Sequence, residues 1–109
     1  SAQFHKTLPH VRKVNMDDPR KAYMVNAYRH ISKNWVPPDL FQGNYRATVT
    51  VKIKRDGNIV GRYFDKKSNN DEFNKAVLKT IARSNPLPPL PNEIDGEILE
   101  LGFLFTTKN

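Results

Sequence analysis

The sequence contains no cysteine, which excludes disulfides and thiolate metal ligands but does not select a cellular compartment. It has no apolar run near the roughly 20 residues of a membrane-spanning helix. The opening SAQFHKTLPHVRK also lacks the apolar segment of a signal peptide. The histidines, serines and carboxylates form no nucleophile, base or metal set. We therefore expect no enzyme, no metal site and no cofactor.

Basic residues, in contrast, are abundant. Eighteen Lys and Arg against eleven Asp and Glu give a net charge of +7, which suits an acidic partner, nucleic acid or an anionic membrane surface. The length of 109 residues and the 38% hydrophobic content predict one compact domain with one core. Residues 1–16 are polar and basic without periodicity, so we interpret them as a flexible arm or the end of a linker, followed by a folded domain at 17–109.

Two segments have the pattern of helices. The first begins at the DDP triplet 17–19, where a carboxylate caps and proline follows, and ends before the prolines at 37–38. Its apolar stripe is Met24, Ala27, Tyr28, Ile31 and Trp35, which predicts a core position for the tryptophan. The second begins after the SNN cap at 68–70 and ends before Pro86. Its stripe is Phe73, Val77 and Ile81, with Ala76 and Leu78 beside it.

Three segments have the pattern of strands. Arg46–Lys54 alternates cleanly, with one apolar face (Ala47, Val49, Val51, Ile53) and one polar, basic face. A second strand is predicted at Asn58–Asp65 and a third at Ile98–Phe105. In the third strand, four apolar residues alternate toward the helices: Leu99, Leu101, Phe103 and Phe105.

The turn between the first two strands decides which face of the second strand is buried. A two-residue turn at Asp56-Gly57 would place Arg62 beside Val51 on the buried side. A three-residue turn with a left-handed Gly57 would leave Arg62 in water. The same turn would place Ile59, Gly61 and Tyr63 on the face of the strand that meets the core. Because burial of an unpaired arginine is the costlier outcome, we predict the three-residue turn.

The order helix, strand, strand, helix, strand predicts an α+β fold: a two-layer sandwich with a three-stranded antiparallel sheet and both helices on one face. We expect the first strand in the centre. The proline-rich stretch Pro86–Pro91 lies between two core elements, so we interpret it as a rigid crossover whose leucines, Leu87 and Leu90, press onto the core edge. The alternative is bait for a proline-reading domain.

At this point the chain resembles a family. The segments YRHISKNWVPP, IKRDGNI, SNNDEFNKAVLKTI, NPLPPLP and ELGFLF, in this order, are similar to the C-terminal domain of TonB/TolA-type energy transducers. The resemblance covers about residues 20–106. The helix that carries Trp35 ahead of the hairpin favours the TolA-like branch, although members of that branch in some bacteria carry a cysteine pair that is absent here.

The resemblance implies a periplasmic domain of a protein that is anchored in the inner membrane by a segment N-terminal to it and driven by an inner-membrane motor. It implies outer-membrane transporters or Tol-Pal proteins as partners, bound through short extended peptides, and colicins or phage proteins that exploit the same domain. Family members occur as monomers or strand-exchanged dimers.

If the first strand is central, the third is an edge, and its outer N–H and C=O groups lack partners. We therefore predict that a partner's peptide pairs with residues 97–105 by β-augmentation. The predicted partner-binding residues are Glu97, Ile98, Leu99, Glu100, Leu101, Gly102, Phe103, Leu104 and Phe105.

A nucleic-acid-binding module is the alternative function. Four basic residues would stand on one open sheet face, with Phe64 as a stacking platform: Arg46, Lys52, Lys54 and Arg62. One aromatic residue is thin support and no RNP-type sequence is present, so we expect no nucleic acid among the partners.

Overall fold

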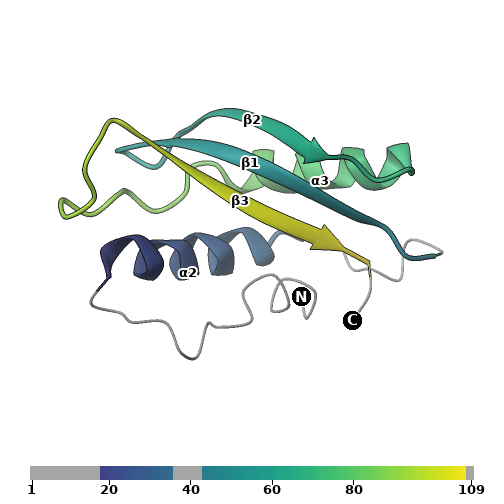
Figure 1. The fold of residues 1–109 in the computed structure, drawn as a ribbon, viewed down its shortest axis with the longest axis horizontal. Helices are drawn as coiled ribbons and strands as arrows, with labels where there is room; N and C mark the ends of the chain where they lie inside the picture. Colours follow the sequence, from purple (N-terminus) through teal and green to yellow (C-terminus); the bar gives the residue numbers. More distant parts are fainter. Residues whose placement is uncertain (1–17, 36–42, 108–109) are drawn as a thin grey trace.

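The computed structural model describes residues 18–35 and 43–107. In chain order, the elements are α2 (Pro19–Ser32), β1 (Arg46–Lys54), β2 (Ile59–Lys66), α3 (Asp71–Ser84) and β3 (Ile98–Thr106). The strands form one antiparallel sheet in the order β2-β1-β3, and α2 and α3 lie on one side of it (Figure 1). The predicted α+β sandwich, its element order and its central first strand are thus confirmed.

Both helices begin at the predicted caps. The Asp18 carboxylate accepts a hydrogen bond from the Arg20 N–H at 3.0 Å, and Pro19 follows it. The Asn70 side chain accepts from the Phe73 N–H at 3.0 Å. Each cap satisfies an N–H that the first turn of a helix leaves without a partner. The predicted arm, residues 1–16, and the prolines at 37–38 lie outside the described residues.

The core lies between the helices and the inner face of β1 and β3. All four inward residues of β1 are buried, and so are Leu99, Phe103 and Phe105 of β3. Trp35 is only 8% exposed and makes edge contacts with Phe73 and Phe105, with ring centroids 5.6 and 4.9 Å apart. Its predicted core role is confirmed.

The turn between β1 and β2 is the predicted one. It has three residues, with Gly57 at φ 94°, and Lys54 donates to the Asn58 carbonyl at 2.8 Å. Ile59 packs inward against the core, as expected.

Beyond Ile59, however, the predicted faces of β2 are wrong. The register pairs Ile59 with Ile53 and Gly61 with Lys52, so Val60 is an extra residue. This β-bulge shifts the alternation by one. Gly61 and Tyr63 therefore lie on the outer face, while Arg62 lies opposite Val51 on the helix side and stays exposed at the sheet edge.

The crossover from α3 to β3 runs beside the β1–β2 turn (Figure 1). Leu87 and Leu90 are buried members of the core, as predicted. Their N–H groups donate to the carbonyls of Gly57 and Arg55, each at 2.9 Å. Because its backbone and its leucines are already engaged within the domain, the stretch is a structural spacer rather than bait for a proline-reading partner.

Candidate partner-binding edge

Two hydrogen bonds near the ends of β1 show which residues of β3 point their backbone N–H and C=O groups toward β1. Lys54 donates its N–H to Asn58, toward β2, and Thr107 donates its N–H to the Tyr45 carbonyl at 3.1 Å. Backbone groups alternate in direction along a strand. The odd residues of β3 therefore bond to β1, in the pairs Leu99–Ile53 through Phe105–Ala47.

The even residues consequently point their N–H and C=O groups away from β1, to the side where the described residues place no further strand. These are Ile98, Glu100, Gly102 and Leu104. They are spaced by two residues, as a docked extended peptide requires. The sequence pattern alone does not show which residues of β3 point their backbone groups outward.

The two edges of the sheet differ in regularity. β3 pairs with β1 over nine consecutive residues without a register shift. β2 has two shifts, where Val60 and Asp65 are the extra residues. Bulges twist an edge and interrupt its row of donors and acceptors, which protects it from pairing. The edge of this sheet with an uninterrupted row of donors and acceptors is therefore β3.

The nine predicted partner-binding residues have different roles in the structure. Leu99, Phe103 and Phe105 are buried with their backbone bonded to β1, so they hold the strand in place rather than face a partner. Glu97, Glu100 and Gly102 are exposed, and Ile98 is 44% exposed. A Cβ at Gly102 would meet no atom within 4 Å, so the outer face is open at this point.

Acidic groups on the outer face have partners within the sheet. The Asp65 carboxylate accepts a 2.8 Å hydrogen bond from Thr50, and Glu100 accepts one of 3.5 Å from the Tyr63 hydroxyl. The Lys52 ammonium lies 6.0 Å from the Tyr63 ring centre. The middle of the face is therefore a hydrogen-bonded cross-strand cluster.

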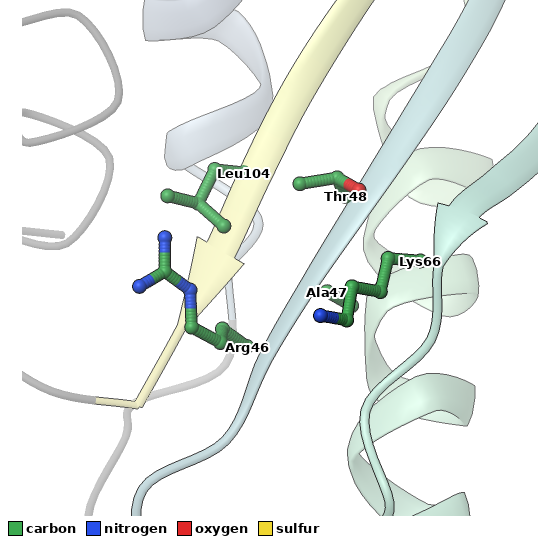
Figure 2. Close-up of a pocket in the computed structure, with 5 residues that line it drawn as sticks. All are labelled: Arg46, Ala47, Thr48, Lys66 and Leu104. Carbon is green, nitrogen blue, oxygen red and sulfur yellow. The ribbon is translucent and has the colours of Figure 1, made fainter.

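The end of this face near Phe105 is different. A shallow hollow of about 70 Å³ lies there, lined by Arg46, Ala47, Thr48, Lys66 and Leu104 (Figure 2). The cationic side chains of Arg46 and Lys66 flank it from two strands. Sequence reasoning missed this feature, because only the register of β1 with β2 and β3 brings these residues together.

The structure does not place all the residues predicted to bind nucleic acid on the open face of the sheet. Phe64 lies opposite Val49 and packs against the core, so it is not a platform on the open face, and Arg62 is on the helix side. Tyr63 takes the outer position instead and is 47% exposed. The bulge at Val60 is the cause of both corrections.

The start of β3 is fixed by Arg55. Its guanidinium donates to the carbonyl oxygens of Ile94 at 2.8 Å, Gly96 at 2.6 Å and Pro91 at 3.0 Å. The planar fork of an arginine can serve several acceptors at once. The β1–β2 turn therefore holds the end of the crossover from which β3 departs.

Tyr23 extends this attachment to the helix layer, in which Tyr28 is also buried. The Tyr23 hydroxyl donates to the Pro88 carbonyl at 2.6 Å, and burial raises the pKa of Tyr23 to about 12. Burial likewise raises the pKa of Tyr28 to about 12. Both phenols are therefore neutral in the folded domain at physiological pH.

Within the described residues, β3 is thus a regular edge strand held in place by a rigid crossover. The sequence model of the TonB C terminal family matches residues 20–105. Because this match spans most of the 109 residues, the chain belongs to the TonB C-terminal family. Domains of this family are periplasmic and bind other proteins.

The match does not confirm the expected leaning to the TolA-like branch. No curated protein and no solved structure matches the chain. Among residues 18–35 and 43–107, no helix is long and apolar enough to cross a membrane.

Proposed function

We propose that this chain is the partner-binding domain of an inner-membrane-anchored energy transducer of the TonB type. It binds a short extended segment of an outer-membrane transporter, which adds to the sheet as a fourth strand beside β3. An N-terminal part of the protein connects the domain to a motor driven by the proton gradient. In a TolA-type variant of this proposal, the segment comes from a Tol-Pal protein.

The observation that carries the proposal is the outer row of backbone groups on β3. Ile98, Glu100, Gly102 and Leu104 present donors and acceptors in regular alternation, next to an edge without a bulge. Such a row binds through the partner's backbone, and the net charge of +7 attracts an acidic segment. No catalytic side chain is needed for this mode of action.

The crossover supports the mechanical part of the proposal. A transducer transmits tension, and tension on a bound strand acts on β3. Arg55 and the hydrogen bonds of Leu87 and Leu90 tie the crossover to the β1–β2 turn, and Tyr23 ties it to α2. Force on the edge is thereby spread over both layers of the fold instead of one hairpin.

The test uses decapeptides selected from a random display library on the 109-residue chain. Amide chemical shifts should change along β3 when a selected peptide binds. Proline at Gly102 or Leu104 removes an outward N–H and should weaken binding at least about tenfold. Gly102→Ala is the matched control, since it keeps the N–H and its Cβ enters open space.

A folded Gly102→Pro or Leu104→Pro variant that binds the peptide as tightly as the parent would overturn strand addition at β3. So would peptides whose binding perturbs only the amides of β2.

A second candidate is nucleic-acid binding on the outer face, favoured by Tyr63, which is exposed there beside Lys52. Salt-dependent binding of mixed-sequence oligonucleotides, lost in Tyr63→Ala, would support it. No binding at low salt would exclude it.

A further inference from the structure

The hollow lined by Arg46, Thr48, Lys66 and Leu104 lies beside the row of backbone groups described above (Figure 2). Leu104 lies opposite Thr48, and Thr48 lies opposite Lys66, so the three form one row across the outer face of the sheet. A strand added beside β3 extends this row by one side chain. That side chain stands next to Leu104, on the side away from Thr48 and Lys66, where the Arg46 guanidinium also lies (Figure 2).

The second bulge of β2 directs Lys66 to this row. Phe64 faces the helices opposite Val49, and strict alternation would return Lys66 to the same inner face. The extra residue Asp65 shifts the alternation, so that Lys66 pairs with Thr48 on the outer face. Bulges re-aim side chains in this way next to functional sites.

Two cations therefore flank the hollow, and the nearby acids are engaged elsewhere. In the described part of the chain, neither Arg46 nor Lys66 forms an ion pair, and the ion pair that is present joins Glu72 and Lys75 on α3. Asp65 is hydrogen-bonded to Thr50. The hollow thus has an excess of positive charge that a carboxylate would neutralise.

We propose that this end of the outer face selects the partner segment: the Arg46 guanidinium binds the carboxylate of an Asp or Glu side chain at the position beside Leu104, and Lys66 adds positive charge from β2. This inference rests on the proposed strand addition to β3 and adds the chemistry that selects the segment. The backbone row supplies sequence-independent bonds, whereas the arginine supplies two parallel donors for a carboxylate.

The same face disfavours an acid elsewhere along the segment. Glu100 is exposed on the outer face, four residues before Leu104, and a carboxylate placed beside it would meet a like charge. The position beside Gly102 opens onto free space and accepts a large side chain. The predicted segment therefore has its acid at one end and no acid four positions away.

The experiment is a double-mutant cycle with the selected decapeptides. Peptides selected on the 109-residue chain should be enriched in one acidic position, and its change to Gln or Asn should weaken binding about fivefold. This loss should vanish on an Arg46→Gln/Lys66→Gln variant. It should persist on Lys54→Gln, a matched control that removes a cation at the far end of the same face.

Four outcomes would overturn the inference. If peptides shift the β3 amides but show no acidic preference, or if the preference survives in the Arg46→Gln/Lys66→Gln variant, the proposed selection is wrong while strand addition stands. If no selected peptide shifts the β3 amides, the proposed function fails as well. If mixed-sequence oligonucleotides bind through Arg46 and Lys66 and displace the peptides, the surface belongs to a nucleic acid.

Discussion

The backbone N–H of Leu87 donates a 2.9 Å hydrogen bond to the carbonyl of Gly57 and thereby joins the crossover to the β1–β2 turn. The approach is so close that a Cβ on Gly57 would collide with the Leu87 carbonyl. Gly57 also has φ 94°, a conformation that residues with a side chain rarely adopt. One glycine therefore serves both the turn and the docking of the crossover.

Gly57→Ala should destabilise the domain by about 2 kcal/mol or more, from backbone strain together with displacement of the crossover. Urea unfolding of the variant and the parent measures the difference. Gly102→Ala is the control, and it should leave stability equal or slightly higher, because glycine weakens a strand and this Cβ meets no atom. Equal stability of Gly57→Ala and the parent would contradict the close packing.

Arg55→Met should lower the free energy of unfolding by about 2 kcal/mol, because three carbonyl oxygens lose a charged donor. Arg55→Lys should recover only part of the loss, since an ammonium cannot reproduce the fork. Hydrogen exchange of the β3 amides should also become faster in both variants. Arg62→Met, which removes an exposed arginine, is the control. Equal losses of stability in the two Met variants would show that the loss of a positive charge, and not the loss of the three hydrogen bonds of Arg55, is the cause.

Much of the architecture could be predicted from sequence because β1 and β3 alternate without interruption. The bounds of β1 are as predicted, and those of β3 differ by one residue. The helix caps at Asp18 and Asn70 could also be predicted, because a short polar side chain just before a helical stripe of apolar residues has few other roles.

The faces of β2 could not be predicted, because neither bulge has a sequence signature. Val60 reads as an ordinary strand residue, and only the pairing with β1 makes it an extra one. The hydrogen bonds of Arg55 to the crossover and the hollow beside Lys66 could not be predicted for a related reason. Each depends on contacts between segments far apart in the chain, which local patterning does not encode.

The domain should lose stability at alkaline pH through its buried tyrosines. Burial raises the pKa of Tyr23 and Tyr28 from 10.0 to about 12, so the unfolded chain releases these protons first. The stabilisation is fully present below pH 10 and is lost as the pH rises toward 12. Urea midpoints between pH 8 and 12 should fall for the parent and fall less for Tyr23→Phe/Tyr28→Phe. Parallel slopes for the two proteins would contradict this assignment.

Deletion of Val60 should convert β2 from a protected edge into a reactive one. The pairs on either side of Val60, Ile53–Ile59 and Lys52–Gly61, can stay in place without it, and its side chain is 52% exposed, so the fold should survive the deletion. The bulge would disappear, however, and β2 would present a regular row of donors and acceptors next to Gly61. We expect the deletion variant to self-associate at concentrations where the parent does not, as measured by sedimentation velocity.

Val60→Thr keeps the extra residue and should sediment like the parent. Peptide binding to β3 should be unchanged in both variants, because that edge lies on the other side of β1. A folded deletion variant that sediments like the parent at every concentration would show that the bulge does not guard this edge.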